Sequence, residues 1–125
     1  MKVKDQIINI SLKNPKEEIC GFVVQKDNEE KVIQCKNKAP EKDKLFLIGA
    51  KDFLNIKRKN EIIAVFHSHI IGSAEPSEFD LKMSEALCYP FIIYSIQENK
   101  FNSHVPKFSE INKEKIAKIL KWKQK

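Results

Sequence analysis

The hydrophobic pattern of the chain alternates between two periods, and each change of period predicts a new element. Four stretches repeat apolar residues at the spacing of a helix face: 3–13, 50–59, 77–87 and 111–122. Five shorter runs are rich in β-branched and aromatic residues, which is typical of strands: 18–25, 31–36, 62–69, 91–96 and 100–105. Helices interspersed with such runs predict one α/β domain, with a mixed central β-sheet flanked by helices.

Polar segments separate these elements. The first helix is expected to end at Asn14-Pro15, because the residue before a proline disfavours helical geometry. The polar residues 26–30 predict the turn of a hairpin, and residues 37–44 predict a loop. Residues 62–69 are apolar at successive positions for most of their length, so this strand is expected to be buried on both faces.

Length and composition agree with a single globular domain. The chain has 125 residues, of which 42% are hydrophobic, and this is enough to bury a core without disulfides. No apolar run approaches the roughly 18 residues that a membrane span needs, and the N-terminus lacks the apolar segment of a signal peptide. The three cysteines are widely spread and form no CxxC pair, which favours reduced thiols and a cytoplasmic location.

The net charge of +6 raises the question of nucleic-acid binding. Residues 107–125 hold seven lysines against Glu110 and Glu114, a balance of +5, so residues 1–106 contribute +1. The positive charge therefore belongs to a basic amphipathic C-terminal helix, expected to pack on the domain or extend from it. Apart from Trp122, no aromatic residue alternates with these lysines to stack on bases, so a solvated helix face is the better explanation.

Two of the three histidines end the strand over 62–69, as His67-Ser68-His69. Side chains two apart on a strand share a face, with Cα atoms roughly 6.6 Å apart, so both imidazoles can bind one cation. Asp80 follows eleven residues after His69, one turn inside the next predicted helix. If that turn folds back over the strand end, two imidazoles and a carboxylate leave a fourth position for water. This is the ligand set of a catalytic zinc site.

Ser77 and Asp80 also have a purely structural interpretation. The sequence Ser77-Glu78-Phe79-Asp80 is a helix N-cap with an acidic residue at the third helical position. Taken alone, the cap is the simpler explanation, but its place shortly after the histidine pair makes the combination specific. Ser77 can serve both purposes, capping the helix and directing its hydroxyl towards the metal centre.

A hydrolytic zinc site also needs a carboxylate that moves a proton. Glu18 is the candidate, since it begins a predicted strand that can lie beside the strand of His67 and His69. The alternative is that Glu17 and Glu18 are ordinary solvated charges.

The order and spacing of these residues resemble the JAB/JAMM (MPN+) zinc metallopeptidases. The matching positions are Glu18-Ile19-Cys20-Gly21, His67-Ser68-His69, and the Ser77 and Asp80 pair that begins after seven further residues. Residues 85–95, with a proline before a strand that a serine closes, are similar to the prokaryotic branch found beside phage-tail and cell-wall peptidase proteins. The resemblance covers about residues 3–105 and implies a single JAB/MPN-like domain of cytidine-deaminase-like architecture.

The resemblance also implies roles for the site residues. His67, His69 and Asp80 correspond to the ligands of one Zn²⁺ per chain, Glu18 to the general base and acid, and Ser77 to an oxyanion-stabilising group. The implied reaction is hydrolysis of a peptide or isopeptide bond, with a peptide or the C-terminal tail of a carrier protein as substrate.

Two features depart from the family pattern. Ile70 stands where the family usually has proline, which affects the rigidity of the loop after His69. That loop is also short and leaves little room for the insertions with which eukaryotic relatives bind ubiquitin. An extended peptide along a sheet edge is therefore the expected substrate.

Two other functions stay open at this point. One is a non-catalytic, zinc-containing module of the same fold in a phage-tail or cell-envelope assembly, with a tail-assembly or cell-wall peptidase partner. The presence of Glu18 favours the enzyme over this module. The other is a basic protein that acts on nucleic acid, like the DNA-repair relatives that share an HxH…SxxD motif. It would show salt-dependent DNA binding.

Overall fold

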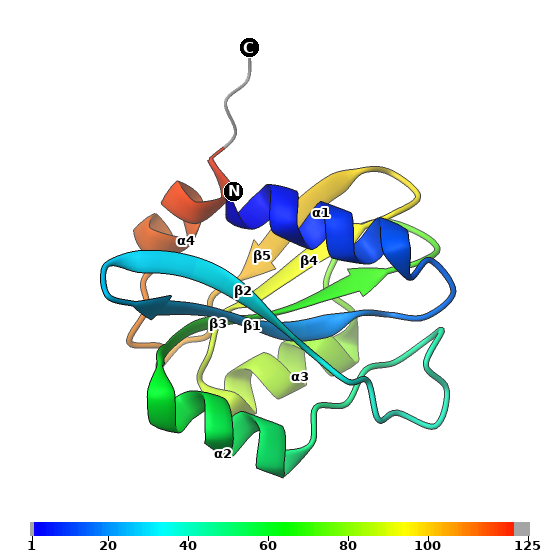
Figure 1. Cartoon of the computed structure of the whole chain (residues 1–125). Coiled ribbons are helices and arrows are strands. Elements are labelled where there is room, and N and C mark those ends of the chain that lie inside the picture. Colours follow the sequence, from blue (N-terminus) through cyan, green and yellow to red (C-terminus); the bar gives the residue numbers. More distant parts are fainter. Residues whose placement is uncertain (1, 122–125) are drawn as a thin grey trace.

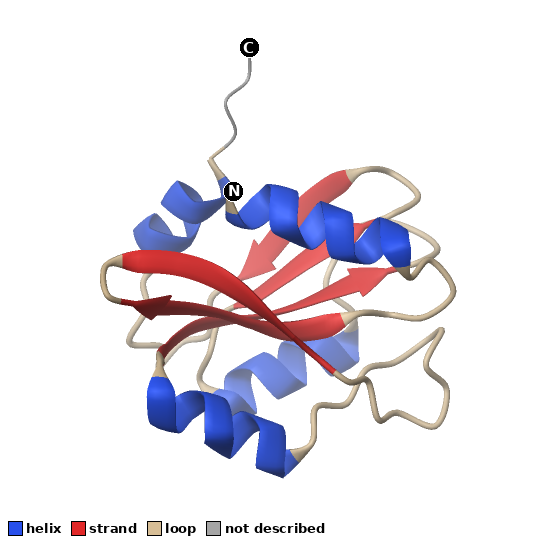
Figure 2. Ribbon diagram, viewed as in Figure 1, coloured by secondary structure: helices blue, strands red, loops and turns tan. Residues whose placement is uncertain are grey.

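A five-stranded sheet forms the middle layer of the structure, a computed structural model that describes residues 2–121 (Figures 1 and 2). Its strands are β1 (Cys20–Lys26), β2 (Glu29–Cys35), β3 (Glu61–His69), β4 (Phe91–Ser95) and β5 (Lys100–His104). Their order is β2-β1-β3-β4-β5, with β3 and β4 parallel and all other neighbours antiparallel. The mixed sheet confirms the predicted fold class, and β3 is its central, buried strand.

Two helices cover each face of the sheet (Figure 1). They are α1 (Val3–Lys13) and α4 (Lys113–Leu120) on one face, and α2 (Ala50–Lys59) and α3 (Glu78–Leu87) on the other. The first pair buries Val3, Ile7, Ile116 and Ile119 against the sheet in one apolar cluster. By contrast, every residue of α2 is described and none of them is buried.

Gly21 in β1 permits an unusually close approach between strands. A Cβ atom at this position would overlap the carbonyl oxygen of Ile33 and lie 2.7 Å from Cε1 of Phe66. The ring of Phe66, on β3, therefore packs directly on the backbone of β1. This contact holds the start of β1 beside the end of β3, where the candidate site residues lie.

The β1–β2 hairpin is tighter than the polar pattern predicted. Its turn consists of Asp27 and Asn28, which both have positive φ angles of 54° and 64°, as two-residue hairpin turns require. The ladder accordingly continues to the pair Lys26 and Glu29, so β2 begins two residues earlier than expected. The prediction assigned all of residues 26–30 to the turn because each is polar.

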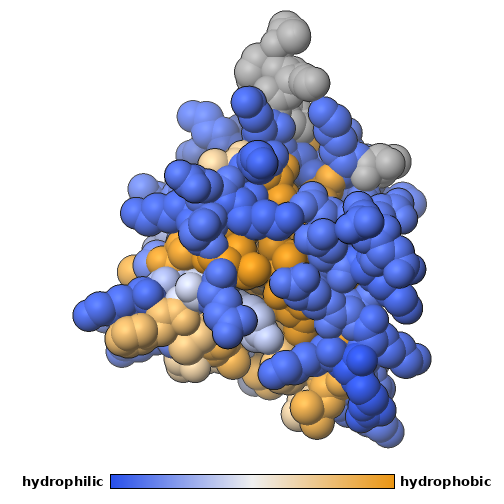
Figure 3. All heavy atoms as spheres, turned by 90° about the vertical axis from the view of Figure 1, so that its left-hand side faces the viewer, coloured by the Kyte–Doolittle hydropathy of each residue, from blue (hydrophilic) through white to orange (hydrophobic). Residues whose placement is uncertain are grey.

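Helix α4 begins at Lys113, because the side chain of Asn112 accepts a hydrogen bond from Lys115 N (2.9 Å) and caps the helix. The predicted end at Trp122 lies outside the described residues. Within residues 2–121, no helix has both the length and the apolar composition needed to cross a membrane. Figure 3 views the side of the molecule that is on the left in Figure 1; hydrophilic residues cover most of it, and hydrophobic residues show between them in the middle and at the lower edge.

Candidate metal centre

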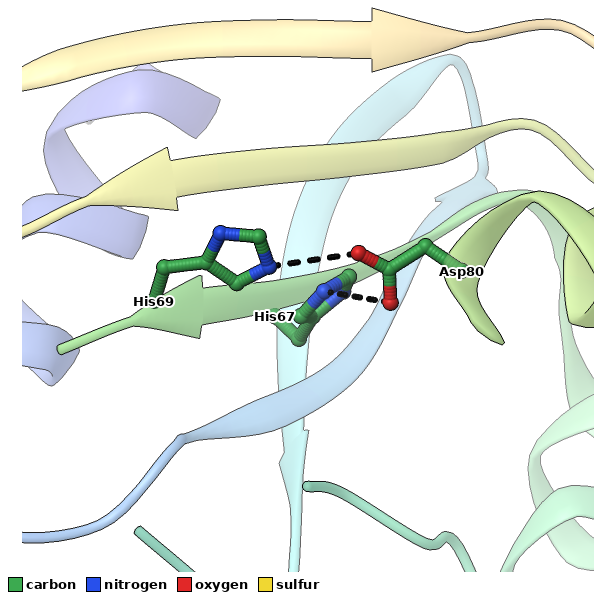
Figure 4. Close-up of side chains that lie close together, drawn as sticks. All are labelled: His67, His69 and Asp80. Atoms are coloured by element: carbon green, nitrogen blue, oxygen red, sulfur yellow. Dashed lines mark hydrogen bonds and ion pairs between the residues drawn. The ribbon is translucent and has the colours of Figure 1, made fainter. Parts of the chain in front are cut away.

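His67 and His69 lie at the end of β3 and point towards the first turn of α3 (Figure 4). Ser68 points to the opposite face, as the strand period predicts. There its Oγ accepts a hydrogen bond from Ile19 N (3.0 Å), and its own N–H donates to Ile19 O (3.0 Å). The serine between the histidines therefore ties the end of β3 to the residue that follows Glu18.

Asp80 completes a cluster with the two histidines. Its Oδ1 lies 3.1 Å from His67 Nε2, and its Oδ2 lies 3.2 Å from His69 Nε2. One candidate ligand atom from each of the three residues lies within 4.8 Å of the others. The geometry therefore allows one metal ion to contact all three side chains.

The carboxylate of Asp80 is fixed by the helix cap. Ser77 Oγ accepts a hydrogen bond from Asp80 N (3.0 Å), and Asp80 Oδ2 accepts one from Ser77 N (2.9 Å). This reciprocal capping box satisfies the first backbone donors of α3. The structural interpretation of the S-x-x-D sequence is thus correct, and the same bonds aim the carboxylate at the histidines.

His67 fits the role of a metal ligand. Its side chain is fully buried, and among the described residues its ring nitrogens have no well-aligned hydrogen bond, only the ion-pair contact of Nε2 with Asp80 Oδ1 (3.1 Å). Buried polar atoms are nearly always hydrogen-bonded, so such a ring needs another partner. Burial lowers the pKa of His67, although Asp80 opposes the shift, and this favours the neutral imidazole that metals bind.

His69 is oriented by its other ring nitrogen. Nδ1 lies 2.9 Å from Ser73 O and donates its hydrogen to that carbonyl, which directs Nε2 towards Asp80. Burial would lower the pKa of His69, but the hydrogen bonds to Asp80 and Ser73 raise it overall. Burial would likewise raise the pKa of Asp80, but its contacts with the two histidines hold it below its usual value.

Two aromatic rings enclose the imidazole of His67. Phe46 stacks on it with ring centroids 4.3 Å apart and planes at 22°, and Phe91 meets it edge-on at 5.8 Å. These rings fix the orientation of His67 and exclude water from one side of it. Sequence reasoning missed Phe46, because nothing in the polar loop before α2 relates it to β3.

Glu18 lines the same pocket as His69 and Asp80 of the candidate metal cluster. The pocket has a volume of about 330 Å³, and Glu18, His69, Ser77 and Asp80 line it together. Glu18 is only 7% exposed, so it is not the solvated charge of the structural alternative. Burial raises the pKa of Glu18 to about 7, with His69 opposing the shift and both Asp80 and Asp43 adding to it.

Asn37 holds the backbone at Glu18, and sequence reasoning missed it as well. Its Nδ2 donates to the carbonyl oxygens of Glu18 and Leu45 (both 2.9 Å). Its Oδ1 accepts from Ala39 N (2.9 Å) and Leu47 N (3.1 Å). The available signal was an asparagine two residues before Ala39-Pro40, which is typical of an Asx turn. Because Glu18 bonds to this loop, β1 begins at Cys20 and not at Glu18.

The loop after His69 is anchored although Ile70 replaces the usual proline. Gly72, at a φ of 91°, donates its N–H to Gln97 Oε1 (2.7 Å), and its carbonyl accepts from Ser95 Oγ (2.6 Å). Ile96 N also donates to His69 O (3.0 Å). The turn after β4 therefore fixes this loop through three hydrogen bonds.

The position of the cluster changes the expectation for the substrate path. The two histidines of the cluster are on β3, which has β1 on one side and β4 on the other, while the unpaired edges of the sheet belong to β2 and β5. A peptide added to an edge strand would not reach the metal ligands. The pocket between residues 43–46 and the start of α3 is the opening that reaches them.

Comparison with known proteins gives consistent matches. The family model described as prokaryotic homologs of the JAB domain matches residues 1–107. Tail tip assembly protein K of Escherichia phage N15 is 29% identical over 90 residues, which are 72% of this chain. They are 37% of the phage protein, so the chain spans little more than a third of that relative's length.

Two solved structures share the fold over nearly their whole length. A JAB1/MPN domain protein from Archaeoglobus fulgidus has 18% identity and a TM-score of 0.57, with 90% of this chain and 95% of that one covered. A structure described as JAMM, a metalloprotease-like zinc site in the proteasome and signalosome, has 18% identity and a TM-score of 0.51. The match covers 90% of this chain and 93% of the chain in that structure. At this identity the likeness establishes the fold.

Proposed function

The chain belongs to the family of prokaryotic JAB-domain homologues, and on this premise we propose that it is a zinc-dependent peptidase acting on a peptide or isopeptide bond. One observation carries the proposal: a buried carboxylate, Glu18, shares a pocket with His69 and Asp80, two of the three convergent candidate ligands. A pKa of about 7 suits a group that must both accept and release a proton near neutral pH.

The residues divide the reaction between them. His67, His69 and Asp80 would hold the Zn²⁺, which would supply Lewis acidity to the scissile carbonyl and lower the pKa of a water molecule. Glu18 accepts the proton of the attacking water and delivers it to the leaving amine. Ser77 Oγ already accepts from Asp80 N, so its own hydrogen is available for the developing oxyanion.

The second candidate is a non-catalytic, zinc-containing module in a phage-tail or cell-envelope assembly. The likeness to tail tip assembly protein K favours this context, with a tail-assembly or cell-wall peptidase protein as partner. The context also suits the enzyme, whose substrate is then a peptide or the C-terminal tail of a carrier protein. Glu18 distinguishes the two, because a module that holds zinc only for stability has no use for a buried carboxylate beside the metal.

The test replaces Glu18 by glutamine and screens a library of internally quenched fluorescent peptides with the zinc-loaded protein. We expect Glu18→Gln to retain zinc but to lose about 10²–10⁴-fold in rate, the usual contribution of a positioned acid or base. Glu17→Gln, one position away and outside the pocket, is the matched control and should cleave like the wild type. Equal cleavage by Glu18→Gln would refute the mechanism, and a wild type that binds zinc and cleaves nothing would favour the module.

A further inference from the structure

We propose that an apolar cavity beside the metal centre is a specificity pocket for one large apolar side chain of the substrate, such as leucine, methionine or phenylalanine. The inference rests on the proposed peptidase function and adds a substrate class to it. It concerns a second cavity, between the sheet, α2 and α3, which the mechanism above does not use.

The cavity has the size and chemistry of a side-chain site. Its volume is about 250 Å³, and the residues that line it are all apolar or aromatic, among them Phe22, Phe53, Val65, Met83, Leu87 and Tyr89. An apolar cavity of roughly 150 Å³ already holds a benzene molecule. One large apolar side chain therefore fits, whereas charged groups would lose their hydration without gaining a partner.

The cavity lies where α2 covers the sheet only partly. Phe53 of α2 reaches the rings of Phe22 (5.8 Å between centroids) and Tyr89 (6.3 Å), yet no residue of this fully described helix is buried. Protein interiors are normally packed as densely as organic crystals. An open apolar cavity on one face of a small sheet, whose other face is well packed, indicates a binding site more than a packing defect.

Two residues connect the cavity to the metal centre. Phe46 and Phe79 line both the cavity and the pocket of Glu18. Phe46 stacks on His67, and Phe79 directly precedes Asp80 and is 40% exposed. The cavity therefore begins one aromatic ring away from a candidate metal ligand. An extended peptide advances roughly 3.3–3.6 Å per residue, so the side chain that enters belongs to a residue next to the scissile bond.

A second copy of the chain is the competing occupant, because Leu47 (49% exposed) and Leu87 (42% exposed) stand at the rim. A stable protein interface buries roughly 800 Å² per partner, however, and a cavity of this size admits one side chain. Continuity with the pocket of Glu18 favours a substrate side chain, and the experiment below includes the second copy as an outcome.

The test fills the cavity without disturbing the metal ligands. Ala50 lines the cavity, is exposed and begins α2, so Ala50→Trp should block the cavity and still fold. Ala86→Trp is the matched control, since Ala86 is an exposed helical alanine on α3 that lines neither this cavity nor the pocket of Glu18. The substrates are two quenched fluorescent peptides that are identical except for one residue next to the cleaved bond, which is leucine in one and alanine in the other.

We expect the wild type and Ala86→Trp to prefer the leucine peptide by at least about tenfold in kcat/KM. Ala50→Trp should lose this preference, so that its kcat/KM for the leucine peptide falls to that for the alanine peptide. Equal cleavage of both peptides by the wild type, or an unchanged preference in Ala50→Trp, would overturn the proposal while leaving the peptidase activity established.

A binding experiment separates the pocket from the reaction. Titration with N-acetyl-leucinamide should shift the NMR methyl signals of Met83 and Leu87 and leave those of Ile116 unchanged. The same titration of Ala50→Trp should produce no shift at Met83 or Leu87. N-acetyl-alaninamide should have little effect on the wild type. If these shifts are observed but no peptide is cleaved, the apolar pocket is supported and the proposed peptidase function is rejected. Shifts that depend on protein concentration instead of ligand identify a second copy as the occupant and overturn the proposal.

Discussion

The two faces of the sheet are built on different principles, although each is covered by two helices. Helices α1 and α4 insert four apolar side chains into one continuous cluster with the sheet. On the other face, no residue of α2 is fully buried, and α3 fully buries only Asp80 and Ser84, both polar; all residues of these two helices are described. The sheet buries an apolar cluster on both faces, but the second face, where Phe22, Val65 and Phe91 are buried, also encloses a polar cluster and an apolar cavity.

This difference indicates where the stability of the domain resides. Burial of apolar side chains is the main favourable contribution to folding, and α1 and α4 contribute more of it than α2 and α3, whose apolar side chains are only partly buried. Helix α3 is held by its capping box and by the bond from Ser84 Oγ to Tyr89 O (2.7 Å). Such bonds position a helix accurately but contribute only about 1 kcal/mol each. Helices α1 and α4 thus complete a packed core, while α2 and α3 leave room on their face for the polar cluster and the cavity.

The largest expected effect concerns the metal. We expect about one zinc ion per chain in protein purified without added metal, and none in the His67→Ala, His69→Ala double variant. Two of three ligands are then missing, while the core on the opposite face is untouched. Elemental analysis measures the zinc, and circular dichroism checks the fold. His104→Ala is the control, because this histidine pairs with Glu85 (2.9 Å) away from the site. Full zinc content in the double variant would reject the assigned ligands.

The next effect compares the two faces directly. Ile7→Ala removes a fully buried side chain of α1 and should lower the free energy of unfolding by about 2–5 kcal/mol. Leu54→Ala removes a side chain of α2 that is 53% exposed and should change it by less than about 0.5 kcal/mol. Urea unfolding of the two variants gives both values. Equal losses would show that α2 contributes to the core as much as α1 does.

The helices could be predicted from the sequence because their signals are local. The bounds 3–13 and 50–59 agree with the structure to the residue, and Ser77 was expected as the cap of α3. The ends of strands depend on their partners and were less accurate. The short turn at Asp27 and Asn28 shows this, since its residues are as polar as their neighbours and only the positive φ angles distinguish them.

In the candidate site, too, the features with local sequence signals could be predicted and those that depend on distant segments could not. The convergence of His67, His69 and Asp80 follows from a strand end and a helix cap, two local patterns that sequence reasoning can combine. The burial of Glu18 and the stacking of Phe46 on His67 depend on the loop before α2, which Asn37 folds through five hydrogen bonds. That loop has no periodicity, so its contacts with β1 and β3 appear only in three dimensions.

The smallest expected effect is a pH dependence confined to the site face. In the metal-free protein, burial raises the pKa of Glu18 from 4.5 to about 7. The folded state therefore binds this proton more tightly than the unfolded state does. The contribution of Glu18 to stability is complete below pH 4.5 and is lost as the pH rises through 7. Glutamine at this position does not titrate and avoids the loss.

In the presence of a chelator, Glu18→Gln and the wild type should therefore have similar free energies of unfolding near pH 4.5. At pH 8 the variant should be more stable by roughly 1–3 kcal/mol, because the wild type must then bury a charged carboxylate. Zinc should narrow this difference, since its positive charge stabilises the carboxylate. Urea unfolding across this pH range measures the difference, and Ile7→Ala provides the control, because its loss should not change with pH. If the free energies of unfolding of Glu18→Gln and the wild type changed in parallel with pH, Glu18 would be ionised in the folded protein at no cost in stability. The face of the candidate site would then bury no titrating charge at a cost in stability and would resemble the face of α1 and α4 in this respect.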